Sequence, residues 1–134
     1  MIELKFTKPV GLNKLINISR SNKFAAAAAK KKATNLAAVE ARQQTKCAIA
    51  CKVYMTYEIS YSTETTDMDN LNSCLKPILD GIVKAGILQD DSLKYMEPMS
   101  FIQYTKAPRV SQYVTVRIFT QPVEFKNYVS SQLF

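Results

Sequence analysis

The clearest pattern in the chain is a long alternation between two faces over Cys47–Ile59. A period of two residues is typical of a strand that buries one face and exposes the other. Shorter alternations predict two further strands at Met1–Phe6 and Tyr113–Phe119, and another strand is predicted at Ser100–Thr105. In the strand predicted at Cys47–Ile59, the face that we expect to be buried carries Cys47, Ile49, Cys51, Val53, Met55, Tyr57 and Ile59.

A first helix is predicted after a linker. Ser21 or Asn22 can cap it, and the alanine run Ala25–Ala29 is strong helix-forming sequence that continues to about Gln43. The preceding segment, Thr7–Arg20, is predicted to be the linker.

A second helix is predicted over Leu71–Val83, where apolar residues recur at spacings of three and four. Pro77 lies inside this pattern and predicts either a kink or the first turn of the main body of the helix. Gly86 is a natural terminator of that helix.

The predicted order is strand, helix, strand, helix, strand, strand, which indicates an α+β (mixed α/β) fold. We expect a single domain over residues 1–134, with one mixed sheet of about four strands and two main helices. The tail after Pro122 shows no clear period, and its apolar residues suggest packing against the body of the protein or a partner. These residues are Val123, Phe125, Tyr128, Val129, Leu133 and Phe134.

Composition narrows the possible chemistry. The chain contains no histidine, which removes Ser-His-Asp and Cys-His hydrolases and nucleases with histidine-bound metal. Its three cysteines lack paired spacing and are too few for the usual four-ligand structural zinc site. The net charge of +7 favours a polyanionic partner, with nucleic acid as the first candidate.

No apolar stretch approaches the roughly 18 residues that span a bilayer, and the N-terminus lacks the apolar region of a signal peptide. We therefore expect no membrane partner and a cytoplasmic location. With only three glycines, the chain has no P-loop and no dinucleotide fingerprint, so we expect no small-molecule cofactor.

Four aspartates flank the second predicted helix. Asp67 and Asp69 precede it at alternate positions, so both carboxylates can face one site. Asp90 and Asp91 follow it. Because a helix of about 15 residues is about 22 Å long, they reach the first pair only if the chain doubles back. Grouped carboxylates disfavour one another's charged form, so such a cluster predicts a bound cation.

Oxygen ligands of this kind suit Mg²⁺, and Mn²⁺ can substitute for it. Such ions can drive phosphodiester hydrolysis without histidine, and Lys76 is the nearest candidate for stabilising charge on the phosphate. Each signal also has a structural interpretation, because an aspartate before a helix is a favourable cap and Asp90-Asp91 can form a simple turn. The prediction of a metal site depends on their combination in a basic, histidine-free chain.

The segment Thr65–Asp91 resembles the RusA family of Holliday-junction resolvases, found in bacteria and their phages. The family signature is D-x-D-N-L-x-K, followed by an apolar helix that ends in a lysine-alanine-glycine-like turn, and then by an acidic D-D pair. The corresponding residues here are Asp67-Met68-Asp69-Asn70-Leu71, Lys76, Ile78-Leu79-Asp80, Lys84-Ala85-Gly86 and Asp90-Asp91.

The resemblance implies that Asp67, Asp69 and Asp91 are metal-binding catalytic carboxylates and that Lys76 is the essential lysine. Asp90, the other member of the acidic pair, is a further candidate metal ligand. The resemblance also implies a homodimer that makes paired, Mg²⁺-dependent nicks in four-way DNA junctions, since a two-fold dimer suits symmetry-related strands.

One departure from the signature concerns the lysine. The family lysine lies four residues after the second aspartate, where this chain has Ser73. Lys76 fits the pattern if three residues, at Asn72–Cys74 or nearby, are an insertion. If that insertion is helical, Lys76 points in a similar direction but lies about 4–5 Å further along the helix.

Two alternative functions remain open. One is a metal-dependent nuclease that acts on other branched DNA or on RNA, and the other is a non-catalytic, basic nucleic-acid-binding protein. The lysines of the first helix form either a solvated surface or a phosphate-contacting one. The candidate DNA-contacting residues are Lys23, Lys30, Lys31, Lys32, Lys52, Arg109 and Arg117.

Overall fold

A computed structural model of the chain describes residues 1–133, except for the side chains of residues 12, 13 and 15; Phe134 of the predicted tail lies outside the described residues. Four strands form one mixed sheet, as predicted: β1 (Ile2–Thr7), β2 (Val53–Tyr61), β3 (Met96–Lys106) and β4 (Tyr113–Phe119). The helices are α1 (Leu12–Ser21), α2 (Lys23–Gln44), α3 (Met68–Asn72), α4 (Leu75–Lys84), the short 3-10 helix η1 (Arg109–Ser111) and α5 (Pro122–Leu133). The predicted α+β class is confirmed.

The strand order in the sheet is β1-β4-β2-β3. β4 pairs antiparallel with both β1 and β2, whereas β2 pairs parallel with β3. Parallel neighbours need a crossover connection, and α3 and α4 form that connection. The carboxyl ends of β2 and β3 therefore lie side by side at the same end of the sheet, where Tyr61 is aligned with Lys106.

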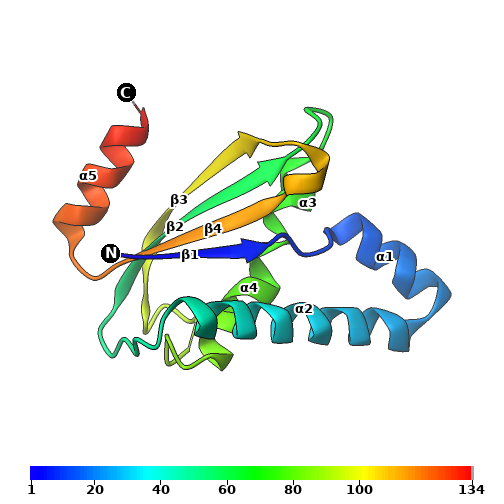
Figure 1. Cartoon of the computed structure of the whole chain (residues 1–134), viewed down its shortest axis with the longest axis horizontal. Coiled ribbons are helices and arrows are strands. Elements are labelled where there is room, and N and C mark those ends of the chain that lie inside the picture. Colours follow the sequence, from blue (N-terminus) through cyan, green and yellow to red (C-terminus); the bar gives the residue numbers. More distant parts are fainter. Residues whose placement is uncertain (134) are drawn as a thin grey trace.

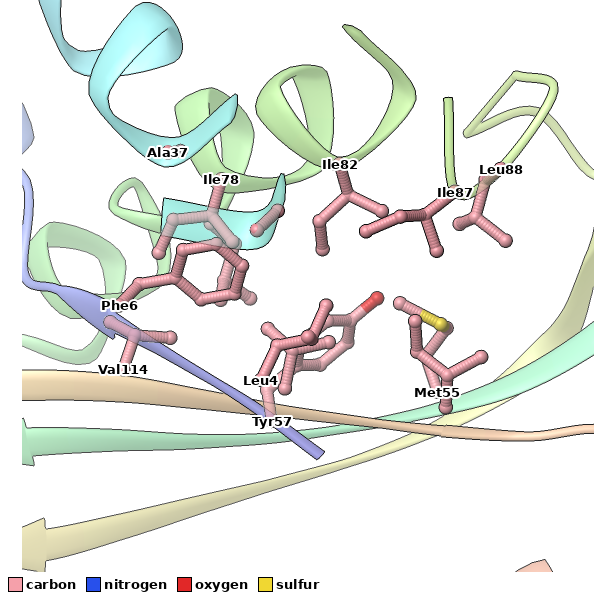
Figure 2. Close-up of a cluster of buried hydrophobic side chains, with 14 of the residues drawn as sticks. Leu4, Phe6, Ala37, Met55, Tyr57, Ile78, Ile82, Ile87, Leu88 and Val114 are labelled. Carbon is pink, nitrogen blue, oxygen red and sulfur yellow. The ribbon is translucent and has the colours of Figure 1, made fainter. Parts of the chain in front are cut away.

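Helices α2 and α4 cover one face of the sheet (Figure 1). Figure 2 shows Ile78 and Ile82 of α4, and Ile87 beyond it, pointing toward Met55 and Tyr57 of β2. All five side chains are buried, and each contributes about 1.5–3 kcal/mol through removal of apolar surface from water. This layer of side chains joins the crossover connection to the sheet.

The alternation that predicts β2 holds from Val53 onward, where Val53, Met55, Tyr57 and Ile59 are all buried. The predicted start at Cys47 is wrong. The strand begins at Val53, and both Cys47 and Cys51 are exposed, although Ile49 is buried.

The structure corrects the predicted linker, and it shows that the tail, for which no element was predicted, packs against the body as expected. The second half of the predicted linker Thr7–Arg20 belongs to α1, which packs against α2; tertiary contact of this kind commonly outweighs modest helix propensity. The tail after Pro122 is α5, with proline at the first helical position, where its missing N–H costs nothing. Its Phe125 ring stacks on Tyr54, 4.9 Å between centroids, so α5 packs on the face of the sheet opposite α2 and α4.

The chain reverses direction at Gly86, which ends α4 with a positive φ of 82°. The Gly86 N–H donates to the Val83 carbonyl at 2.9 Å, and the Ile87 N–H donates to the Ile82 carbonyl at 3.3 Å. This pair of bonds is the Schellman motif, and the buried contact of Ile82 with Ile87 that usually accompanies it can form here. The terminator predicted at Gly86 is confirmed, and the chain doubles back after it.

Gly81 allows α4 to approach α2 closely. A Cβ atom at this position would lie 2.5 Å from the Ala37 Cβ and 2.8 Å from the Ala38 nitrogen. We expect Gly81→Ala to lower the free energy of unfolding, because overpacking costs about 1–3 kcal/mol whereas the better helix propensity of alanine returns at most about 1 kcal/mol. Urea unfolding measures the difference, and an unchanged or higher midpoint would contradict this packing.

Candidate functional site

Asp67 and Asp69 lie on the connection from β2 to α3. Asp67 is the N-cap residue of α3 but its carboxylate accepts no capping hydrogen bond, and Asp69 is in the first turn. Both residues are exposed, and their carboxylates form no hydrogen bond or ion pair with the described part of the chain. The Asp67 side chain therefore does not cap α3 in this structure. Both carboxylates are free to bind a ligand.

The predicted single helix over Leu71–Val83 is divided into α3 and α4 by a turn at Ser73 and Cys74. The insertion inferred from the sequence thus coincides with the break. Asn72 accepts a 2.6 Å hydrogen bond from the Tyr104 hydroxyl of β3, and the Cys74 thiol donates to the Pro9 carbonyl at 3.3 Å. Burial raises the pKa of the Cys74 thiol, which favours this protonated, donating form.

The break places Pro77 at the third residue of α4, which confirms its predicted place in the first turn of the main helical body. Lys76 is the second residue of α4 and is 69% exposed. Its position near the start of the helix follows from the turn, not from continuation of α3.

Lys76 lies between two carboxylates. Its Nζ donates to Asp80 Oδ1 at 2.9 Å and to Asp91 Oδ2 at 3.4 Å. The first pair is one helical turn apart, but the second joins residues 15 apart in sequence and exists because the chain doubles back at Gly86. The hydrogen bond and charge of Asp80, followed by those of Asp91, raise the pKa of Lys76.

The four aspartates do not form one cluster in this structure. Asp91 contacts Lys76, whereas Asp90 is exposed. Within residues 1–133, no group of three or more His, Cys, Asp or Glu residues is arranged to hold a metal ion. The donor chemistry of Asp67, Asp69 and Asp91 suits Mg²⁺, but their placement does not, so this geometry supports no reaction step through a metal ion.

Tyr57 lies beneath this site on β2. Its burial, and secondarily the charge of Asp91, raise the pKa of its phenol. The stability that follows from this shift is complete below the unfolded-state value of about 10 and is lost as the pH rises toward the folded-state value. The pattern predicts Tyr57 as a core residue but gives no sign of its proximity to Asp91.

We expect the free energy of unfolding to fall above about pH 10, and to fall less steeply in Tyr57→Phe. The raised pKa values of Cys74, Lys76, Tyr113 and Tyr128 act in the same direction, and the lowered pKa of Lys8 acts in the opposite one. The substitution therefore reduces the slope without removing it. Urea unfolding between about pH 8 and pH 11 measures the slope of the free energy of unfolding against pH. An identical slope in the variant would contradict the assigned role of Tyr57.

The predicted basic residues fall into separate groups. Lys23, Lys31 and Lys32 are exposed on α2. Lys30 lines a groove between α2, α4 and the β1–α1 loop, of about 410 Å³, together with Lys76 and Asp80. We call this the helix groove; its lining residues are Pro9, Val10, Ala29, Lys30, Ala33, Thr34, Ser73, Lys76, Pro77 and Asp80.

Two of the predicted DNA-contacting residues have protein partners in this structure. Arg117 is only 16% exposed and donates to Glu3 at 2.9 Å and to Glu58 at 3.4 Å, while its guanidinium lies over the Tyr128 ring. Lys52 pairs with Glu97 at 3.9 Å. Arg117 therefore holds β4, β1, β2 and α5 together, and no spacing in the sequence indicates this role.

The sequence patterns indicate no site role for Asp80, Tyr104 or Lys8. Asp80 belongs to the quoted motif, and its spacing of four from Lys76 on a predicted helix is the signal that could have identified the pair. Tyr104 and Lys8 carry no such signal. Lys8 donates to the Ser60 carbonyl at 2.7 Å and anchors the β1–α1 loop on β2, and burial lowers its pKa.

Comparison of the chain with models of protein families gave no match, and comparison with curated proteins gave none. Among residues 1–133, no helix combines the length and apolar character needed to cross a bilayer.

Proposed function

We propose that this protein is a Mg²⁺-dependent endodeoxyribonuclease that cuts four-way DNA junctions. The observation that carries the proposal is the contact of Lys76 with Asp91. These two residues are separate elements of the RusA-like signature, and the fold joins them although they are 15 positions apart in sequence. The agreement of an ordered motif with a tertiary contact is more specific than either alone.

The exposed aspartates supply the second part of the argument. Asp67 and Asp69 lie on a connecting segment of a chain whose net charge is +7, and no described residue neutralises their carboxylates. A surface of this kind attracts the phosphodiester backbone through the basic residues while presenting carboxylates to it. Asp67, Asp69 and Asp91 are the residues that would hold Mg²⁺, and the ion would supply charge stabilisation at the phosphodiester.

The proposal requires one rearrangement. Asp91 would have to leave Lys76 and approach Asp67 and Asp69 before the three carboxylates could hold Mg²⁺. The Lys76–Asp91 pair is exposed, 69% and 31% respectively, and exposed pairs contribute only about 0–1 kcal/mol. Breaking this ion pair therefore costs little, and it would also free the Lys76 ammonium to stabilise charge on the phosphate.

A homodimer is part of the proposal because two symmetric sites can nick symmetry-related strands of a junction. A cytoplasmic location, in a bacterial cell or a phage-infected host, goes with this activity. Both statements rest on the resemblance of residues 65–91 to the family.

The test uses a synthetic immobile four-way junction and a linear duplex of the same sequence, each with Mg²⁺ or with EDTA. We expect symmetric nicks in the junction only, and only with Mg²⁺. Cleavage of flaps, forks or RNA instead would identify a different nuclease. Salt-dependent binding without any cleavage in Mg²⁺ or Mn²⁺ would reject the enzyme and favour the non-catalytic binder, which the absence of a carboxylate cluster from residues 1–133 also favours.

A further inference from the structure

Two hollows adjoin one another at the carboxyl edge of the parallel strands β2 and β3, and they have Thr63 in common. The first, about 670 Å³, we call the edge hollow; it is lined by Ser62, Thr63, Lys106, Ala107, Pro108 and Arg109. The second, about 210 Å³, we call the tyrosine hollow; it is lined by Tyr61, Thr63, Glu64, Thr66, Met68, Leu71 and Tyr104. Ligands commonly bind beyond the carboxyl ends of parallel strands, where connecting loops diverge.

The edge hollow has the donors that an anion requires. Arg109 is exposed and forms no ion pair with the described residues. Lys106 pairs with Glu64 at 3.4 Å, but these side chains are 62% and 75% exposed, so a phosphate can replace the carboxylate at little cost. The hydroxyls of Ser62 and Thr63 add neutral donors, and charge-assisted hydrogen bonds to phosphate are the stronger kind.

The tyrosine hollow has the apolar and aromatic surface that a nucleobase requires. Tyr61 and Tyr104 are both half-buried at its wall, with Met68 and Leu71 beside them. The Tyr104 ring is held by its 2.6 Å hydrogen bond to Asn72, so little side-chain entropy is lost when a base stacks on it. Bases stack on aromatic side chains with little preference for sequence.

The position of Met68 relates the two hollows to the candidate carboxylates. Met68 is 61% exposed, lines the tyrosine hollow and lies between Asp67 and Asp69 in the sequence. A strand whose base occupies this hollow would therefore present a neighbouring phosphodiester to the segment that carries both aspartates. The edge hollow, on the other side of Thr63, would hold an adjacent phosphate.

We infer that the two hollows bind one unpaired nucleotide of a DNA strand, with its base against Tyr61 and Tyr104 and a phosphate on Lys106 and Arg109. The inference rests on the proposed function for the identity of the strand as DNA. It adds a specific requirement, which is that the nucleotide beside the cleaved bond leaves the base stack. A four-way junction supplies such nucleotides at its centre more readily than a linear duplex does, because unstacking an already weakened pair costs less.

The test measures stacking in the absence of cleavage. A short single-stranded DNA that contains the fluorescent base 2-aminopurine is titrated with the full-length protein in EDTA, and the quenching of its emission is recorded. The chain contains no tryptophan, so protein emission does not overlap with the probe. We expect strong quenching with the unsubstituted protein.

Three variants separate the parts of the site. Tyr104→Leu is expected to lose the quenching and about fivefold to a hundredfold in affinity, whereas Tyr104→Phe, which keeps the ring, retains most of both. Lys106→Ala combined with Arg109→Ala is expected to weaken binding and to lower the slope of log affinity against log salt by about 1–2. Lys126→Ala removes an exposed lysine of α5, away from both hollows, and serves as the matched control.

Each outcome supports or overturns the inference. Quenching that persists in Tyr104→Leu, or a salt slope unchanged in the double variant, overturns it. If Tyr104→Leu does not fold, loss of quenching in Tyr104→Phe or an unchanged salt slope in the double variant still overturns it. Because EDTA prevents cleavage, a protein that quenches the probe but never cuts junctions keeps this inference and loses the proposed function, and one that cuts without quenching does the reverse.

Discussion

Asp69→Asn is expected to lower the rate of junction cleavage at least about a thousandfold while junction binding persists. The substitution keeps the size of the side chain and removes the charge that a Mg²⁺ ligand needs. Loss of one member of a catalytic group that acts as a unit commonly costs this much or more. Binding is expected to hold or to strengthen, because removal of a negative charge favours approach of the phosphate backbone.

The folded state should tolerate this substitution. Asp69 is exposed and its carboxylate has no protein partner in the described chain, so the free energy of unfolding is expected to change by no more than about 0.5 kcal/mol. Asp67→Asn is expected to behave in the same way. Glu124→Gln, which removes an exposed carboxylate of α5, is the matched control and should cleave normally. Full activity in both aspartate variants would reject the catalytic assignment.

Lys76→Ala is expected to lower the cleavage rate about a hundredfold to a thousandfold, the range for removal of one donor that stabilises charge in the transition state. Junction affinity should fall much less, because one phosphate contact among many contributes little to binding. Single-turnover cleavage at saturating protein measures the rate, and gel-shift titration in EDTA measures affinity. Lys126→Ala, which removes an exposed lysine of α5, is the control.

The helix groove offers a direct alternative for this role. Lys30 lines the same groove as Lys76, so either ammonium is close to a phosphate that lies there. If Lys76→Ala cleaves normally and Lys30→Ala does not, the lysine of α2 takes the assignment. That result would mean that Lys76 does not occupy the position that the resemblance gives to the family lysine.

Secondary structure was predicted well where one physical signal dominates. The apolar face of β2 from Val53 to Ile59 and that of α4 bury surface in one direction, so their periods are visible in the sequence. α5 was missed because it packs on the rings of Tyr54 and Phe119, and partners distant in sequence leave no local period. α1 was missed although its apolar residues recur at helical spacing, because Pro9 and Gly11 before it indicate a linker.

The site was predictable in part for similar reasons. The need for a reversal after Gly86 followed from the length of the helix, and the Schellman motif provides it. The contact of Lys76 with Asp91 depends on that reversal and on the turn at Ser73 and Cys74. The spacing could not show that Asp91 would pair with a lysine. Whether a carboxylate binds a protein cation or a metal ion depends on which of them lies close to it in the folded chain.

The pairing of β1 with β4 also constrains how the chain folds. Ile2 is aligned with Ile118, so the first strand finds its partner only when nearly the whole chain is available. β2, α3, α4 and β3 are contiguous in sequence and can assemble beforehand, which leaves one edge of β4 unpaired until β1 arrives. Contacts of such long sequence separation slow folding, and exposed strand edges favour association during that interval. The pairing of β1 with β4 thus closes that edge of the sheet, and a shortened β1 is expected to favour aggregation over native assembly.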